Sequence, residues 1–333
     1  MQIVLQGLRS LAAALAIASL PTLAAAEADV AFFNGKTVNY VVATEPGGGY
    51  DTYGRLVAEF MQKYLPGSTF VVRNVPGAGH IIGANQIHAA KPDGLTIGTF
   101  NTGLVYGQIA GVDGIRFDLE KMSWIGKAAT DPRVLMVSSK SGIDSVEQLL
   151  ASKSPVLFGA TGVGSSDYVD MVMLADALEL PVQIISGYGG KENEMGMMRG
   201  EIQGVVGSRS SYEPFVRDGK GRFIAQLGGD QTDVPQLDNY AKTDKGREIL
   251  RLMEAQSTVI RLTVGPPGIP EARLEALRDA YRQALSDPEL LERAKTMGLP
   301  VDPLVGEEVM PAIHAQFDLS PETRAYVTGL LKK

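Results

Sequence analysis

The sequence VVATEPGGGYD, residues 41–51, joins an apolar run through a glycine-rich turn to a polar segment suited to begin a helix. Residues 156–167, VLFGATGVGSSD, repeat the same order. A turn of this kind leaves several backbone N–H groups unpaired beside a helix N-terminus, where the helix dipole favours an anion. One such turn in each of two lobes, facing across a cleft, predicts a site for the two ends of a diacid.

Apolar runs alternate with amphipathic stretches along most of the chain. Strands are expected at runs rich in Val, Ile and Phe and bounded by Gly, Pro or polar residues: 38–43, 70–74, 95–100, 134–138, 156–159, 182–185, 202–206, 223–227 and 258–264. Helices are expected at 51–64, 166–178 and 270–285, and the chain beyond Val264 is almost wholly helical in pattern. This alternation predicts parallel α/β layers. Since no linker separates two halves, we expect two lobes between which the chain crosses more than once.

Composition excludes several classes of function. The chain has 333 residues, no cysteine and a net charge of −7. Without cysteine it has no disulfide framework, thiol nucleophile or lipid-modified cysteine anchor. An acidic chain with no basic stretch is a poor binder of nucleic acid or of an anionic membrane. The three histidines lie far apart in the sequence, and no metal or other cofactor is expected.

Residues 1–26 have the pattern of a secretory signal peptide. Arg9 precedes an apolar stretch at 11–23, and the small residues AAA at 24–26 suit a cleavage site. The apolar stretch is shorter than the roughly 20 residues that a transmembrane helix requires. We therefore expect cleavage after Ala26 and export of a protein that carries no lipid anchor.

The glycine-rich turns do not match the motifs of nucleotide-binding or hydrolytic enzymes. Thr52 stands where a dinucleotide fingerprint requires its last glycine, and the chain contains no P-loop and no G-x-S-x-G elbow. A secreted hydrolase that uses Ser166 is a remote alternative. Asp51 and Ser165 are either ligand contacts or helix caps that bond their own backbone, and for Asp51 the cap is slightly favoured. His80, at the end of the PGAGH turn, is more often a surface or capping residue.

Further segments extend the pattern. PGGGYD at 46–51 is followed by RNVPGAGHIIG at 73–83 and AAKPDGLTIG at 89–98, and the second half contains GATGVGSS at 159–166, YGG at 188–190, MRGEI at 198–202 and VGPPGIP at 264–270. As an ordered set over residues 38–299, these segments resemble the extracytoplasmic solute receptors of tripartite tricarboxylate transporters, the Bug family.

The resemblance implies a type II periplasmic-binding-protein fold, in which two α/β lobes joined by crossover hinge strands close on a ligand. The implied lobes are 27–131 with 262–333, and 132–261. The implied protein is a monomeric periplasmic receptor, not an enzyme. It captures a small organic carboxylate (dicarboxylate, tricarboxylate or aromatic acid) and delivers it to the large and small membrane subunits of a transporter. The ligand-binding residues implied are Gly47, Gly48, Gly49, Tyr50, Asp51, Gly77, Ala78, Gly79, His80 and Thr102 in the first lobe, and Thr161, Gly162, Ser165, Ser166, Tyr188, Gly189 and Ser208 in the second.

The chain departs from the family pattern where ligand choice is decided. His80 replaces a glycine, Arg73 a glutamate, Gly189 a lysine and Gln203 an aspartate, and the segment 191–194 is more charged than expected. The identity of the ligand therefore stays open.

Two further questions stay open at this level. Tyr50, Tyr106 and Tyr188 either line the cleft for a longer or aromatic acid or serve only for packing. An extracytoplasmic sensor that signals to a membrane kinase would use the same fold and bind the same class of solute.

Overall fold

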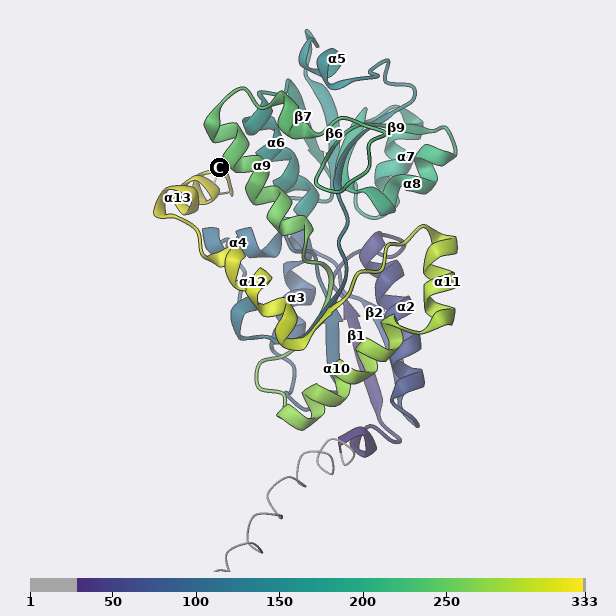
Figure 1. The fold of residues 1–333 in the computed structure, drawn as a ribbon. Coiled ribbons are helices and arrows are strands. Elements are labelled where there is room, and N and C mark those ends of the chain that lie inside the picture. Colours follow the sequence, from purple (N-terminus) through teal and green to yellow (C-terminus); the bar gives the residue numbers. More distant parts are fainter. Residues whose placement is uncertain (1–28, 332–333) are drawn as a thin grey trace, which may run out of the picture.

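The computed structural model describes residues 29–331, which form two α/β lobes joined by crossing segments (Figure 1). The first sheet contains, in spatial order, β11 (Leu304–Val305), β4 (Ser123–Ala129), β10 (Ile260–Gly265), β3 (Thr96–Thr99), β1 (Thr37–Val42) and β2 (Thr69–Asn74). The second contains β7 (Val182–Ser186), β6 (Val156–Ala160), β8 (Gly204–Ser208), β5 (Arg133–Ser138) and β9 (Gly221–Leu227). The predicted leader, residues 1–26, lies outside the described residues. Within 29–331, no helix combines the length and the apolar character that a membrane span requires.

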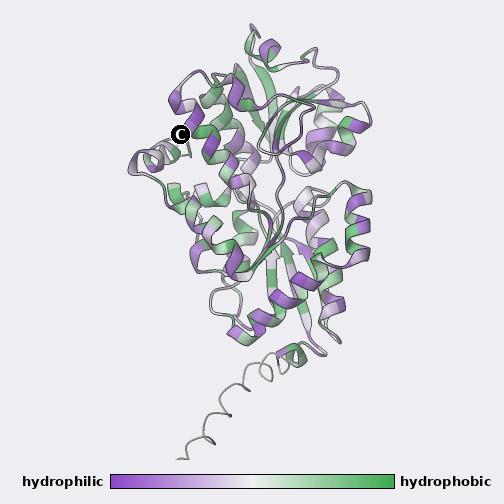
Figure 2. Ribbon diagram, in the orientation of Figure 1, coloured by the Kyte–Doolittle hydropathy of each residue, from purple (hydrophilic) through white to green (hydrophobic). Residues whose placement is uncertain are grey.

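Helices cover both faces of each sheet, and their apolar sides face inward (Figure 2). In the first lobe, α2 (Gly49–Tyr64), α10 (Glu271–Leu285) and α11 (Pro288–Met297) pack on one face, and α3 (Ile81–His88), α4 (Leu104–Ala110) and α12 (Met310–Phe317) pack on the other. In the second lobe, α5 (Val146–Leu150), α6 (Ser166–Leu178) and α9 (Asp244–Ser257) cover one face, and α7 (Glu192–Arg199) and α8 (Arg209–Arg217) cover the other.

All nine expected strands are present, but the expectation of wholly parallel layers is wrong. β5 runs antiparallel to β8 and β9, and β10 runs antiparallel to β3 and β4. Each of these two strands is the first after a crossing between the lobes. The chain leaves one sheet at its cleft edge and enters the other from the same cleft, so the entering strand must run away from the cleft. As a result, the carboxyl ends of β1, β3, β6 and β8 all meet at the interface between the lobes.

The last helix, α13 (Pro321–Leu331), lies beside the second lobe (Figure 1). The resemblance to the receptor family had implied that residues 262–333 belong to the first lobe. Helix α13 packs on α4 and reaches α6 and α9. The Tyr326 hydroxyl donates to Asp176 at 2.7 Å, and the Lys245 ammonium lies 4.7 Å from the centre of the Tyr326 ring. The C-terminal segment therefore contacts both lobes.

A buried ion pair ties the two crossings together. Arg261 Nη2 lies 3.2 Å from Asp131 Oδ2, and both side chains are almost wholly buried. Asp131 also accepts a hydrogen bond from the backbone N–H of Ser210 at 3.1 Å and another from its hydroxyl. Arg261 donates to the Ser211 hydroxyl at 3.0 Å. The pair thus holds both crossings against the start of α8.

The same arginine contacts the glycine-rich turn of the first lobe. The Arg261 guanidinium lies 4.7 Å from the ring centre of Tyr50 and 5.0 Å from that of Tyr53, as in cation–π contacts. A Cβ atom at Gly49 would lie 2.5 Å from the Ser211 hydroxyl and 2.6 Å from the guanidinium. Gly49 therefore lets the turn approach the crossing closely.

We predict that Arg261→Met lowers the free energy of unfolding by about 3–5 kcal/mol, because it leaves the Asp131 carboxylate buried without its cation. The matched control is Arg293→Met, which removes an exposed pair with Glu59 and should cost less than about 1 kcal/mol. Urea denaturation measures both values. Equal losses in the two variants would show that the buried pair has no special role.

Candidate ligand-binding site

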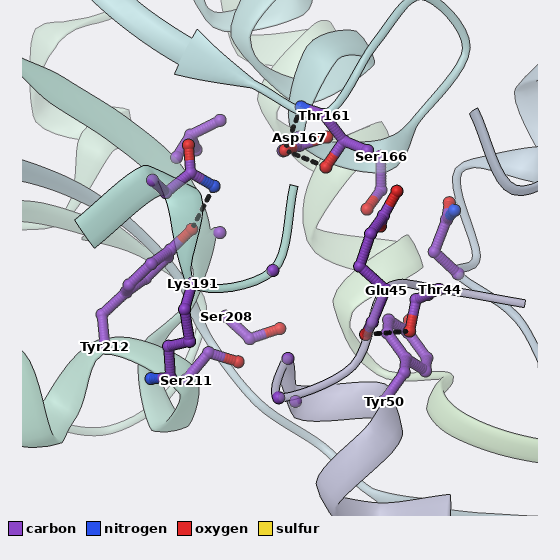
Figure 3. Close-up of a pocket in the computed structure, with 18 of the residues that line it drawn as sticks. Thr44, Glu45, Tyr50, Thr161, Ser166, Asp167, Lys191, Ser208, Ser211 and Tyr212 are labelled. Atoms are coloured by element: carbon purple, nitrogen blue, oxygen red, sulfur yellow. Dashed lines mark hydrogen bonds between the residues drawn. The ribbon is translucent and has the colours of Figure 1, made fainter. Parts of the chain in front are cut away.

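A polar cavity lies between the lobes, where the carboxyl ends of strands from both sheets meet (Figure 3). Its volume is about 110 Å³, whereas a single water needs roughly 10–15 Å³. It is lined by Thr44, Glu45, Gly47, Gly48, Gly49, Tyr50, His80 and Asn101 of the first lobe and by Arg133, Thr161, Ser166, Asp167, Gly190, Lys191, Asn193, Glu194, Val206, Gly207, Ser208, Ser211 and Tyr212 of the second. Val206 is the single aliphatic residue in this lining, so the cavity suits a polar molecule.

The first-lobe turn leaves donors free for a ligand. Asp51 does not line the cavity: its Oδ2 accepts the N–H of Gly47 at 2.9 Å, and its Oδ1 accepts from the Asn74 amide at 2.9 Å. The N–H groups of Gly48 and Gly49, at the beginning of α2, find no protein acceptor within residues 29–331. These donors lie in the cavity lining at a helix N-terminus, where an anion is favoured.

The second-lobe turn is similar in part: its side chains take up the N–H groups of Thr161 and Gly162, whereas the N–H groups of Ser166 and Asp167, at the beginning of α6 in the cavity lining, find no protein acceptor within residues 29–331. Asp167 Oδ2 accepts the N–H of Thr161 at 2.8 Å and the Thr161 hydroxyl at 2.9 Å. The Ser165 hydroxyl accepts the N–H of Gly162 at 3.2 Å and donates to the carbonyl of Gly162. The expectation that both turns present free N–H groups therefore holds for the first turn and fails at Thr161 and Gly162 of the second.

The structure brings part of the predicted set to the cavity. Predicted residues in its lining are Gly47, Gly48, Gly49, Tyr50, His80, Thr161, Ser166 and Ser208. Predicted residues outside its lining are Asp51, Gly77, Ala78, Gly79, Thr102, Gly162, Ser165, Tyr188 and Gly189.

Several of the predicted residues outside the cavity lining have hydrogen-bond partners elsewhere. Asp51 and Ser165 cap their own turns, and the Tyr188 hydroxyl donates to Glu201 at 3.1 Å, away from the cavity. The carbonyl of Thr102 accepts from the backbone at the start of α4. Tyr106 is buried and donates to the carbonyl of Leu252 at 3.0 Å, so it serves for packing.

Two glycines allow the lobes to touch beside the cavity. A Cβ atom at Gly79 would lie 2.6 Å from the carbonyl oxygen of Val163. A Cβ atom at Gly103 would lie 2.6 Å from the Cα atom of Ser166. In both places a first-lobe glycine meets second-lobe backbone, so the two lobes are in contact beside the cavity.

Sequence reasoning did not identify the charged wall of the cavity. Arg133 begins β5 directly opposite Ser208 of β8, donates to the Ser208 hydroxyl at 3.1 Å and pairs with the buried Asp170. Burial lowers the pKa of the Arg133 guanidinium below its usual value. Glu45, Lys191, Asn193 and Tyr212 were also missed as cavity residues. Glu45 lies within the first glycine-rich turn and Lys191 within the charged segment 191–194. The uncharged Asn193 of that segment and Tyr212 carry no local signal of their own, and only the fold places the four together.

Hydrogen bonds to Asp51 make the first-lobe turn sensitive to pH. Burial acts to raise the pKa of Asp51, but hydrogen bonds from Arg55, Gly47 and Asn74 outweigh it and hold the pKa below the usual value. A carboxyl group with a lowered folded-state pKa stabilises the fold fully above its unfolded pKa of about 3.9, and this contribution is lost as the pH falls through the folded value.

We predict that Asp51→Asn costs about 1–3 kcal/mol of folding free energy at pH 7, because charge-assisted bonds to the turn are lost. The difference from the wild type should shrink when both are measured at pH 3. Urea denaturation at the two pH values measures this change, and Asp113→Asn, on an exposed aspartate, is the control. A difference that is equally large at both pH values would contradict this assignment.

Comparisons with known proteins agree with this geometry. The family model described as "Tripartite tricarboxylate transporter family receptor" matches residues 54–315. A UPF0065 protein of Bordetella pertussis is 24% identical over 312 residues, which cover 91% of this chain and 93% of that protein.

Solved structures share the fold. The periplasmic binding protein BugD superposes with a TM-score of 0.72 at 21% identity, over 89% of this chain and 97% of BugD. MatC of Rhodopseudomonas palustris, with bound malate, superposes with a TM-score of 0.71 at 20% identity, over 89% of this chain and 99% of MatC. These likenesses show a two-lobed periplasmic-binding-protein fold with mixed sheets. Since the family model spans most of the chain, the chain belongs to the Bug receptors of the tripartite tricarboxylate transporter family, which are solute-binding proteins and not enzymes.

Proposed function

We propose that this receptor captures a small organic carboxylate between its lobes. One observation carries the proposal: the N–H groups of Gly48 and Gly49 lie at the N-terminus of α2, in the lining of a polar cavity between the lobes, without a protein acceptor among the described residues. Free N–H groups and the helix dipole together attract an anion. A carboxylate accepts several such charge-assisted bonds at once.

Groups of the second lobe complete the proposed site. The Arg133 guanidinium and the hydroxyls of Ser166, Ser208 and Ser211 line the opposite side of the cavity. A ligand that contacts both lobes binds the closed form more tightly than an open one, and so shifts the population toward closure. The shared fold with MatC, in which malate is bound, supports this class of ligand.

The family supports a role in transport. We propose that the leader is removed after Ala26, that the mature protein acts in the periplasm as a monomer, and that it delivers its ligand to the large and small membrane subunits of a transporter. In this proposal, the lobes 27–131 with 262–333 and 132–261 move about the two crossings, and α13, which contacts both lobes, changes its packing as they move. The surface of the closed form is then what the membrane subunits recognise.

We predict that a small carboxylate raises the thermal midpoint of the mature chain, residues 27–333. A ligand at about 100 times its dissociation constant adds roughly 2.7 kcal/mol of stability, which shifts the midpoint by several degrees. Thermal-shift measurements against mono-, di- and tricarboxylates, made after refolding to remove any bound solute, test this. No shift with any carboxylate would overturn the proposal.

We predict that Gly103→Ala weakens ligand binding by about 5–150-fold, because a methyl group 2.6 Å from the Cα atom of Ser166 overpacks the contact between the lobes, at a cost of roughly 1–3 kcal/mol. The same methyl group lies 2.8 Å from Asn101 Oδ1 of its own lobe, a side chain that must also shift. The backbone at Gly103 has φ −59°, which alanine adopts without strain. Gly162→Ala is the matched control, because nothing lies within 4 Å of its added Cβ. Calorimetric titration of both variants measures the effect, and equal affinities would argue against closure at Gly103.

A further inference from the structure

Most charged side chains around the cavity are paired with one another. Lys191 Nζ lies 2.6 Å from Glu194 Oε1, and Arg133 is bonded to Asp170. Asp167 is held by the donors of its own turn. The cations of the cavity wall are therefore already neutralised, and a ligand meets few uncompensated charges.

Glu45 is different from these acids. Its one ionic partner within residues 29–331 is His80, whose Nε2 lies 3.5 Å from Oε2, and about a third of its side chain is exposed. The Asn101 amide contacts Nδ1 of His80; with Nδ1 as the acceptor, the ring proton lies on Nε2 and faces Glu45. The hydrogen bond with His80 holds the pKa of Glu45 below its usual value, so Glu45 keeps its negative charge at neutral pH.

Glu45 also extends to the second lobe. A Cβ atom at Gly189 would lie 2.9 Å from Cδ of Glu45 and 3.1–3.2 Å from its two carboxylate oxygens. Figure 3 shows the Glu45 side chain pointing from the first lobe across the cavity toward Ser166 and Asp167. Since residue 189 has no side chain, the carboxylate meets backbone there, and among the described residues no second-lobe cation lies within 4.0 Å of it.

The two ends of the cavity therefore differ in what they accept. Free N–H groups at Gly48 and Gly49 favour an anion, whereas on the second-lobe side the Glu45 carboxylate points toward the beginning of α6 (Figure 3). An ionised Glu45 repels a second carboxylate in the same cavity and attracts a hydrogen-bond donor.

We propose that Glu45 determines specificity by binding a donor group, an ammonium or a hydroxyl, on the ligand at a distance from its carboxylate. The ligand class is then an amino- or hydroxy-substituted monocarboxylate, and an unsubstituted dicarboxylate is rejected. This inference rests on the proposed capture of a carboxylate.

The test compares ligands that differ only in one terminal group. Calorimetric titration of the mature chain uses 4-aminobutyrate, 4-hydroxybutyrate and succinate, and the corresponding acids with three, five and six carbons. At the best chain length, the wild type should bind at least one donor-bearing acid about tenfold or more tightly than the dicarboxylate. Glu45→Gln keeps the size and removes the charge, so it should reduce this preference by about tenfold.

Two further variants separate the role of Glu45 from general effects. Glu59→Gln removes an exposed carboxylate elsewhere and should leave the preference unchanged. Gly189→Ala places a methyl group against the Glu45 carboxylate, so it should displace that group and reduce the preference while the charge is kept. If Glu45→Gln does not fold, Gly189→Ala still tests whether the Glu45 carboxylate determines the preference.

The outcomes distinguish this inference from the proposed function. Equal or tighter binding of the dicarboxylate by the wild type would overturn the role of Glu45, and so would an unchanged preference in a folded Glu45→Gln variant. If none of these series binds but another carboxylate does, the specificity inference fails and carboxylate capture stands. If no carboxylate binds at all, capture itself fails.

Discussion

The buried ion pair between Asp131 and Arg261 is the interaction on which the arrangement of the two lobes depends. Asp131 lies in the first crossing, between β4 and β5, and Arg261 lies at the start of β10, where the second crossing ends, so the pair holds the two crossings together. Such a pair is costly to break, because either partner alone would be a buried, unpaired charge. Arg261 also packs on Tyr50, beside the glycines that hold the free N–H groups. The hinge and the proposed carboxylate site are therefore in direct contact.

Two similar turns have different chemistry because of a few side chains. Asp51 and Asp167 each bond the backbone of the turn that precedes their helix. In the second turn, Ser165 takes up a further N–H group, whereas the first turn has glycine next to its helix and leaves the N–H groups of Gly48 and Gly49 free. Both helices still begin with free N–H groups in the cavity lining, so the difference between the two sides comes from Glu45, which lies against the second lobe at Gly189.

The sequence predicted the strands whose composition is rich in branched and aromatic residues, and it missed β4 and the two-residue strand β11. Strand β4 reads SWIGKAA, and its buried Lys127 interrupts the apolar pattern; Asp302, distant in sequence, neutralises the lysine at 2.8 Å. Strand direction was also predicted wrongly, because it depends on where the chain crosses between lobes and not on local composition.

The candidate site was predictable only where it consists of turns. Glycine-rich turns before helices have a local signature, so the first-lobe wall was found. Arg133 and Tyr212 lie in a strand and a helix that carry no motif, and the crossings bring them to the cavity. Asp51 and Ser165 show the remaining difficulty: a polar residue at a helix start caps its own turn as readily as it binds a ligand, and only the hydrogen bonds distinguish the two roles.

The central claim is that the free N–H groups at the beginning of α2 hold the ligand carboxylate. The most direct measurement is backbone amide NMR of the mature chain, with and without the best carboxylate from the thermal-shift panel. We expect large shifts and slower hydrogen exchange at Gly48 and Gly49, and much smaller changes at Gly47 and Thr161, whose N–H groups are already bonded to aspartates. Unchanged Gly48 and Gly49 amides in a ligand-saturated protein would contradict the account.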